Sequence, residues 1–200
     1  MNVIDQVHSG YVLNRRVRIL GEQLAPLFPQ NAQVLDVGCG DGLLSKWIME
    51  NRPDVHIFGI DVLVRSDAHI PVTHFDGQSI PHPAESFDAV LFVDVLHHTL
   101  DPMVLLREAA RVTRQWIIIK DHNRNGLLAG PTLRFMDWVG NARYGVALPY
   151  NYWPEQRWTE AFAQLRLTPA IKQTKVPLYP WPASWVFGRR LHFIAKLQKG

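Results

Sequence analysis

One stretch of the sequence, QVLDVGCGDGLL at residues 33–44, decides the fold. It opens with a short apolar run, continues with Gly38, Gly40 and Gly42, and leads into a helical pattern from Leu43 to Glu50. This order predicts a strand, a glycine turn and a helix. Such a turn lets a ligand approach the backbone closely, at the positive end of the helix dipole.

The spacing of the glycines excludes two phosphate-binding motifs. Leu43 stands where the third glycine of the G-x-G-x-x-G dinucleotide fingerprint is needed, and no Lys-Ser or Lys-Thr pair completes a P-loop. Two carboxylates indicate another ligand, because Asp36 precedes the turn and Asp61 follows the next apolar run, where it can accept both hydroxyls of a ribose. A ligand with a ribose and a positive charge fits these acids better than a pyrophosphate does.

Strand and helix patterns alternate along the first part of the chain, which predicts a parallel sheet covered by helices. Beyond Asp121 the pattern weakens, and residues 123–151 are expected to form an insertion or lid with one short helix. The segment Val176–Phe187, rich in Pro and Trp, is expected to be a rigid loop. The expected strands are 33–37, 55–60, 71–75, 87–93, 116–119, 168–176 and 190–197, and the expected helices are 11–28, 43–50, 103–112, 133–139 and 154–165.

Length and composition indicate one globular unit, since 200 residues with 47% hydrophobic and 20% charged content suffice for one sizeable core. The single cysteine, Cys39, excludes an internal disulfide and any cluster that needs several cysteine ligands. No apolar run approaches the roughly 18 residues that a membrane span requires, and residues 1–10 lack the apolar run of a secretory signal. The expectation is a soluble, cytoplasmic protein.

The net charge of +3 conceals two parts of opposite sign. Residues 1–123 contain 10 Lys and Arg against 15 Asp and Glu, a balance of −5. Residues 124–200 contain 11 against 3, a balance of +8. The basic part is therefore where an anionic partner is to be sought.

Four segments carry a resemblance to a known family: VLDVGCGDG at 34–42, GIDV at 59–62, FDG at 75–77 and SFDAVLFVDVLHH at 86–98. With them the chain resembles the class I S-adenosylmethionine-dependent methyltransferases, and more narrowly their type 11 branch, which includes enzymes of the ubiquinone and menaquinone pathways. The resemblance covers about residues 32–120. It implies an α/β fold, a Rossmann-like three-layer sandwich whose seven-stranded, mostly parallel sheet has an antiparallel last strand.

The resemblance also implies how a single methyltransferase domain over residues 1–200 is divided. Residues 1–30 are expected to place a helix over the pocket, and residues 32–120 to form the cofactor-binding core. Residues 121–153 are the expected lid or insertion, and residues 154–200 the C-terminal helix with the last two strands.

S-adenosylmethionine is the cofactor that the resemblance implies, with S-adenosylhomocysteine as its product. The turn Gly38–Gly40 is expected to wrap the methionyl part, with Cys39 packed and chemically inert within it. Asp36 is expected to orient this turn or to face the amino group of the cofactor. Asp94, at the end of the fourth strand, is expected to lie under the methionine moiety.

The adenosine part of the cofactor has its own expected contacts. Asp61 is expected to accept the ribose hydroxyls, and Val62 to pack on the adenine. Asp76 is expected to accept a hydrogen bond from the adenine amino group, with Gly77 alongside. These positions agree with the rule that ligands of open α/β sheets lie outside the carboxyl ends of the strands.

Methyl transfer is an in-line displacement at an activated carbon, so the protein mainly has to align the acceptor. A base is needed only where the acceptor must lose a proton. His98 is the candidate base, and His122 beside Asp121 is a candidate acceptor contact, while His97 is expected to be structural. For each of these histidines, a plain role as a hydrogen-bonded cap of a turn stays open.

A metal is not expected, although some O-methyltransferases hold Mg²⁺ with acids at two strand ends. Asp94, Asp121 and Asn123 stand at the matching places, but His122 interrupts the acid-acid-amide pattern. The aromatic segment at residues 148–153 either covers the core or forms a wall of the acceptor pocket. Arg15 and Arg16 of the first helix are expected to face solvent.

Nucleic acid is not expected as the substrate. An Asn/Asp-Pro-Pro-Tyr turn, typical of enzymes that methylate adenine, is replaced by Asp94-Val95-Leu96-His97, and no cysteine follows the fourth or fifth strand to attack cytosine. The prediction is methyl transfer to an O or C atom of an anionic or aromatic small molecule. The alternatives are a catalytically silent S-adenosylmethionine-binding protein, or one that docks on RNA or membrane through its basic C-terminal part.

Overall fold

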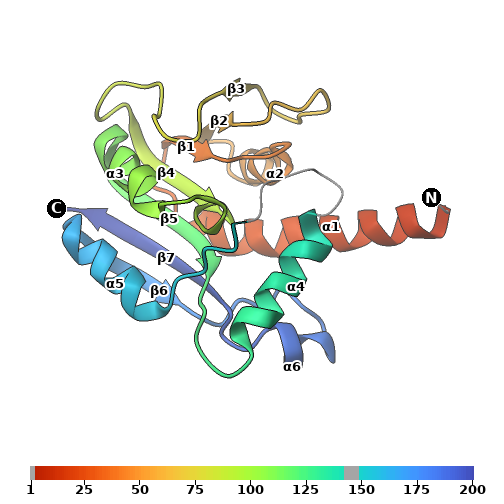
Figure 1. Cartoon of the computed structure of the whole chain (residues 1–200). Helices are drawn as coiled ribbons and strands as arrows, with labels where there is room; N and C mark the ends of the chain where they lie inside the picture. The colour runs from red at the N-terminus through yellow and green to blue at the C-terminus, as the bar shows by residue number, and fades with distance from the viewer. Residues whose placement is uncertain (1–2, 142–148) are drawn as a thin grey trace.

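Seven strands form one sheet in the order β3-β2-β1-β4-β5-β7-β6 (Figure 1). The computed structural model describes residues 3–141 and 149–200. Neighbouring strands from β3 to β5 are parallel, whereas β7 is antiparallel to both β5 and β6. The predicted sheet with its antiparallel last strand is confirmed. The strands are β1 Gln33–Val37, β2 His56–Asp61, β3 Val72–His74, β4 Phe87–Val93, β5 Thr113–His122, β6 Leu167–Gln173 and β7 His192–Lys199.

Helices cover both faces of this sheet. The helices of the described residues are α1 Val3–Leu24, α2 Leu43–Asn51, α3 Pro102–Val112, α4 Ala129–Asn141, α5 Glu155–Gln164 and α6 Ala183–Phe187, with short 3₁₀ turns η1 Ala25–Leu27 and η2 Leu96–His98. None of the helices in this part of the chain is long and apolar enough to cross a membrane.

The sheet separates two apolar clusters, because successive side chains of a strand point to opposite faces. In β1, Leu35 and Val37 belong to one cluster and Val34 to the other. The first cluster includes side chains of α3 and α5, and the second includes side chains of α1 and α2. The chain therefore has the predicted three-layer sandwich architecture.

Several elements differ from the sequence-based prediction. Strand β5 extends from Thr113 to His122 instead of 116–119, since it pairs with β4 on one side and with β7 as far as His122 on the other. Helix α1 begins at Val3 rather than Tyr11. The segment Val176–Phe187 was predicted as a loop but contains the short helix α6.

The predicted lid at residues 121–153 is only partly described. Its helix, α4, is longer than the predicted 133–139. Residues 142–148, Leu148 among them, lie outside the described residues. Helices α4 and α6 lie beside one another at the lower edge of Figure 1, beyond the sheet. Whether this segment acts as a lid stays a prediction.

Candidate cofactor and acceptor site

The glycine turn between β1 and α2 is held by hydrogen bonds to the end of β2. The Gly38 N–H donates to the carbonyl oxygen of Ile60 at 2.8 Å, and the Gly40 N–H donates to Oδ2 of Asp61 at 2.8 Å. Gly38, Gly40 and Gly42 all have positive φ, between 61° and 73°. Only glycine adopts this left-handed conformation without steric cost, so the backbone itself explains the repeated glycines.

The surroundings of the three glycines show where a ligand has room. A Cβ built on Gly38 would lie 2.6 Å from Val95 Cγ2, and one built on Gly42 would lie 2.4 Å from Ile70 Cγ1. A Cβ on Gly40 would meet no described atom within 4 Å. Gly38 and Gly42 are therefore packing positions, whereas Gly40 faces open space that a cofactor can enter.

Cys39 packs between the turn and the sheet rather than facing the open side. Its Sγ lies 2.7 Å from the position of a Cβ built on Gly59. Burial, together with the charges of Asp36 and Asp61, raises the pKa of the thiol well above its usual range. The thiol is consequently not a nucleophile at neutral pH, in line with the inert role expected of it.

Asp36 and Asp61 serve the turn in different ways. The buried Asp36 carboxylate accepts a hydrogen bond from Ser45 Oγ at 2.5 Å, which ties β1 to α2. Burial raises the pKa of Asp36 to about 7, although the Ser45 hydroxyl acts against this. Asp61 is less buried, and its second oxygen accepts from the Leu63 N–H at 2.8 Å. Of the two, Asp61 lies on the side of the turn that a ligand can reach.

The residues expected at the adenine lie together beyond β2 and β3. A Cβ on Gly77 would be 3.1 Å from Val62 Cγ1, so these two positions are neighbours, and the Val62 side chain is exposed. Asp76 accepts the N–H groups of Gln78 and Ser79 on one oxygen, Oδ1. These bonds lower the pKa of Asp76 and keep it ionised, and the bond from Ser79 has the larger effect.

Asp94 forms ion pairs with two basic side chains. It directly follows β4, has a positive φ of 57°, and pairs with the ammonium of Lys120 and the guanidinium of Arg16. Burial would raise the pKa of Asp94, but Lys120 and the neighbouring cations hold it well below its usual range. Arg16 is exposed, as expected, but its guanidinium also reaches Asp94 because α1 passes over the end of β4. Arg15 likewise donates to the carbonyl oxygen of Leu178.

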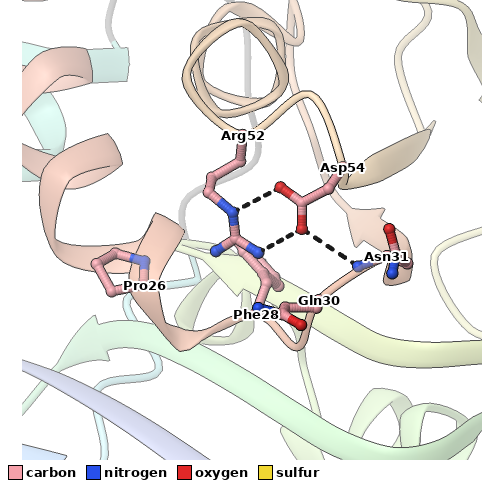
Figure 2. A pocket seen from close by; sticks show the side chains of 6 residues that line it. All are labelled: Pro26, Phe28, Gln30, Asn31, Arg52 and Asp54. Carbon is pink, nitrogen blue, oxygen red and sulfur yellow. Dashed lines mark hydrogen bonds and ion pairs between the residues drawn. The ribbon is translucent and has the colours of Figure 1, made fainter.

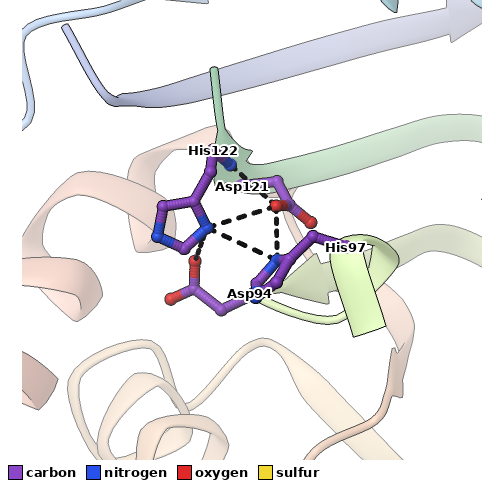
Figure 3. Close-up of side chains that lie close together, drawn as sticks. All are labelled: Asp94, His97, Asp121 and His122. Carbon is purple, nitrogen blue, oxygen red and sulfur yellow. Dashed lines mark hydrogen bonds and ion pairs between the residues drawn. The ribbon is translucent and has the colours of Figure 1, made fainter. Parts of the chain in front are cut away.

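His97 is a buried imidazolium between two carboxylates. Its Nδ1 is 2.7 Å from Oδ1 of Asp121 and its Nε2 is 3.3 Å from Oδ2 of Asp137 in α4 (Figure 3 shows the first contact). Burial opposes the charge, but the two carboxylates raise the pKa of His97 to about 10. His97 is thus a fixed positive charge that joins η2, β5 and α4, which agrees with the structural role expected of it.

His98 and His122 lie next to this charge and are neutral. Their rings are 4.1 Å and 4.6 Å from the His97 ring. Burial and the charge of His97 lower the pKa of both. His98 is half-buried, and within the described part of the chain its Nδ1 has no hydrogen-bond partner. A neutral imidazole with a spare nitrogen is what a general base requires.

One further group of side chains has the spacing of metal ligands. Asp94, His97, Asp121 and His122 each offer one atom, and these atoms lie within 4.8 Å of one another (Figure 3). Asp94 is already paired with Lys120, and Asp121 with the charged His97. A divalent cation would have to displace these bound cations, so the arrangement does not favour a metal.

The structure adds participants that sequence reasoning missed. Lys120 is buried in β5 beside Asp94, and His192 at the start of β7 lies 3.4 Å from its Nζ. Tyr152 donates from its hydroxyl to Asp137, and its ring stacks 5.3 Å from His97. A lysine in an apolar strand run was the one available signal, since a buried lysine needs a partner.

A hollow of about 500 Å³ lies at the opposite end of the sheet (Figure 2). Its two charged side chains form an ion pair with each other, since Arg52 donates from Nε and Nη2 to Asp54 at 2.8 and 2.7 Å. Arg52 also donates to the carbonyl oxygens of Ala25 and Pro29. The Asn31 N–H donates to Asp54 as well. These bonds join η1 to the loop between α2 and β2, so the hollow is part of the scaffold.

Comparison with known proteins agrees with the fold. A family described as "Methyltransferase domain" matches residues 11–169. The chain belongs to this family, and the predicted class, a class I S-adenosylmethionine-dependent methyltransferase, is confirmed with its cofactor. A solved S-adenosylmethionine-dependent methyltransferase from Aquifex aeolicus superposes with a TM-score of 0.61 at 15% identity, over 90% of this chain and 88% of that one.

Three curated relatives are each similar over more than half of this chain. One is 27-O-demethylrifamycin SV methyltransferase of Amycolatopsis mediterranei, 29% identical over 55% of this chain and 48% of that one. Another is a ubiquinone biosynthesis O-methyltransferase of Azorhizobium caulinodans, 29% identical over 66% of this chain and 53% of that one. A third is a tRNA (carboxymethyluridine(34)-5-O)-methyltransferase of Schizosaccharomyces pombe, 26% identical over 62% of this chain and 59% of that one. The chain spans about half the length of the curated relatives it matches.

Proposed function

We propose that this protein transfers a methyl group from S-adenosylmethionine to an O or C atom of a small-molecule acceptor. The observation that carries the proposal is the hydrogen bond from Gly40 to Asp61. It holds an open glycine turn and a ribose-binding carboxylate together at the carboxyl ends of two neighbouring strands, where ligands of such sheets bind.

Each cofactor residue has a role in this proposal. The turn Gly38–Gly40 wraps the methionyl part, and Asp61 exchanges a backbone contact for the ribose hydroxyls. The neighbouring Val62 and Gly77 hold the adenine, with Asp76 at its amino group. Asp36 orients the turn through Ser45, which favours the first of the two roles that the sequence left open.

The chemistry asks little of the protein beyond alignment. S-adenosylmethionine supplies a methyl group bound to a sulfonium, which is a good leaving group. Orienting the acceptor accounts for up to about 7–11 kcal/mol of the barrier for a well-aligned pair. Where the acceptor is a phenol or an acidic carbon, the neutral His98 takes its proton, and burial together with the fixed charge on His97 lowers the pKa of His98 and keeps it neutral at pH 7. His122 is a contact on the acceptor side.

The relatives favour oxygen as the methylated atom, since the ubiquinone enzyme among them is an O-methyltransferase. The tRNA relative makes RNA a second candidate acceptor. Against RNA stands the lack of an adenine-type or cytosine-type catalytic motif after β4 and β5. A small acceptor, anionic or aromatic, therefore remains the proposal, in a cytoplasmic protein.

One observation favours the silent alternative, in which the protein binds the cofactor without chemistry. Asp94, proposed to lie under the methionine moiety, is already paired with Arg16 and Lys120. Two cations next to a positively charged cofactor reduce the attraction that Asp94 offers it. Activity measurements are therefore needed beside binding measurements.

Calorimetry with S-adenosylmethionine and S-adenosylhomocysteine tests the cofactor site. Asp61→Ala is expected to abolish binding, because both of its oxygens serve the turn and the ribose. Asp67→Ala removes an exposed acid from the loop after β2 and is the matched control. If the unaltered protein binds neither compound, the proposal is wrong.

Formation of S-adenosylhomocysteine with a panel of phenols tests the transfer step. His98→Ala is expected to keep the affinity for the cofactor and to slow transfer by roughly 10²–10⁴-fold, the usual contribution of a general base. His56→Ala, at an exposed position of β2, controls for the loss of an imidazole. Transfer at the unaltered rate in His98→Ala would remove His98 as the base, and binding with no transfer to any acceptor would favour the silent alternative.

A further inference from the structure

Helix α4 is apolar on two sides, of which only one is covered. On the covered side, Ala129 and Leu133 pack with Tyr152 and Leu191 in a small core of their own. The other side exposes a second row of large apolar residues at helical spacing. This row consists of Leu128, Phe135, Trp138 and Val139.

The segment that contains α6 adds more exposed aromatic residues next to this row. Trp181 is 85% exposed and Trp185 is 80% exposed. The rings of Phe135 and Phe187 stack at 6.4 Å, which joins α6 to α4. Arg189 strengthens the junction, since it donates to the Val186 carbonyl oxygen at 2.9 Å and to Thr132 Oγ1 at 3.3 Å.

We call the exposed apolar residues of the two helices and their flanks the α4–α6 surface. At about 150–250 Å² for each aromatic side chain, its three tryptophans alone expose roughly 500 Å². The largest apolar patch of a typical soluble monomer is about 300–600 Å² in total and often functional, so the tryptophans alone already reach that size, and the other members add to it. Its members are Leu127, Leu128, Phe135, Trp138, Val139, Trp181, Trp185 and Val186.

The charge around the α4–α6 surface has a single sign. Residues 126–139 and 174–191 contain one acid, Asp137, which is buried and held by His97. The basic side chains of Lys175, Arg189 and Arg190 are exposed. A hollow of about 470 Å³ opens beside the two arginines, and the one acid on its wall, Glu155, is paired with Lys172.

We propose that the α4–α6 surface docks this protein on an anionic lipid bilayer. Exposed tryptophans among aliphatic side chains, with a rim of basic residues, are the combination that inserts into the interface of acyl chains and anionic headgroups. Each basic residue near such a membrane strengthens binding about five-fold. The proposal goes beyond methyl transfer and does not depend on it.

A bilayer fits this surface better than RNA does. Aromatic rings stack on bases, but Leu127, Leu128 and Val139 have no counterpart on RNA, whereas acyl chains cover them. The back of α4 carries Asp137, which contacts His97 at the acceptor side of the site. A protein docked through α4 therefore keeps that side of the site close to the lipid surface.

Flotation of the full chain with vesicles tests the proposal. Vesicles of phosphatidylcholine mixed with phosphatidylglycerol are expected to bind the protein, and vesicles of phosphatidylcholine alone are expected to bind it at least ten-fold less. The double variant W181A/W185A is expected to lower binding to the mixed vesicles at least ten-fold. Phe58→Ala, which removes a half-exposed aromatic side chain from β2, is expected to leave it unchanged.

The charge contribution has its own matched pair of variants. Arg190→Glu is expected to weaken binding to the mixed vesicles on the order of ten-fold, and less so at high salt. Arg107→Glu makes the same change at an exposed position of α3 and is expected to have no such effect. These positions are exposed, so the variants are expected to fold.

Three results would overturn the proposal. The first is no binding to the mixed vesicles, or binding that W181A/W185A does not weaken. The second is a dimer in light scattering that W181A/W185A dissociates, which would assign the surface to a second copy of the chain. The third is RNA binding that depends on Trp181, Trp185 and Arg190 while vesicle binding does not.

Discussion

The glycine turn has two roles, packing against the protein and leaving room for the cofactor. Alanine substitutions at Gly42 and Gly40 test these roles separately, because the two glycines differ in what surrounds them. Gly40→Ala places a Cβ in open space, and Gly42→Ala places one 2.4 Å from Ile70 Cγ1. Both glycines have positive φ, of 61° and 73°. Both variants therefore incur the same backbone strain, and they differ only in packing and in access for the ligand.

The expected magnitudes follow from these contacts. A left-handed residue with a Cβ loses about 1–2 kcal/mol, which is the whole cost for Gly40→Ala and lowers the melting temperature by about 2–8 °C. Gly42→Ala also forces Ile70 to move, which adds about 1–3 kcal/mol of overpacking. The loss of affinity for S-adenosylhomocysteine is expected in the reverse order. It is larger for Gly40→Ala, because the new methyl group occupies the space proposed for the cofactor. A loss of affinity of at least ten-fold, about 1.4 kcal/mol, is expected there.

Thermal denaturation and calorimetry with S-adenosylhomocysteine measure the two effects on the same samples. Calorimetry is done well below both melting temperatures, so that the affinity refers to folded protein. Gly42→Ala is expected to be the less stable variant and to retain affinity within a few-fold. A Gly40→Ala protein that binds as tightly as the unaltered one would refute the assignment of the open side of the turn to the cofactor.

Three further variants test the charged groups. Asp121 and Asp137 raise the pKa of His97 from 6.5 to about 10 against the effect of burial. The free energy of unfolding is therefore expected to fall as pH rises from about 6.5 to about 10, and urea titrations of His97→Gln should lack this fall. Ser45→Ala removes the hydrogen bond that favours the ionised form of Asp36, whose pKa is about 7. The loss of about 1–3 kcal/mol in the free energy of unfolding should therefore be larger above pH 7 than below it, and equal losses would contradict this. Arg52→Ala is expected to lose about 2–4 kcal/mol of stability with unchanged affinity for S-adenosylhomocysteine, and a weakened affinity would mean that the hollow in Figure 2 affects the site.

The strands and the turn were predictable because their signals are local. The run at residues 87–93 is apolar and bounded by polar residues, and β4 has those bounds. The glycines at 38, 40 and 42 have positive φ, which glycine adopts without steric cost. Asp61 could be placed near the turn because the carboxyl ends of adjacent parallel strands meet at one edge.

The acceptor side was only partly predictable. His97, His98 and His122 were visible as histidines after strand ends, but their protonation depends on partners far away in sequence. Asp121 in β5, together with Asp137 in a helix that the sequence describes weakly, makes His97 a cation, and burial and that cation keep the other two neutral. The ion pair of the exposed Arg16 with Asp94 was missed because nothing in the pattern of α1 shows that this helix passes over Asp94.

The sequence by itself determined the order of strands and helices, the glycine turn and the family, because each follows from short-range periodicity and spacing. Only the tertiary structure decided which charges meet. It pairs Lys120 of β5 with Asp94, which directly follows β4, and it exposes the outer side of α4 although that side is as apolar as a core. The physical reason is that electrostatic energy and burial depend on distance in space, and residues far apart in sequence set that distance only once the chain has folded.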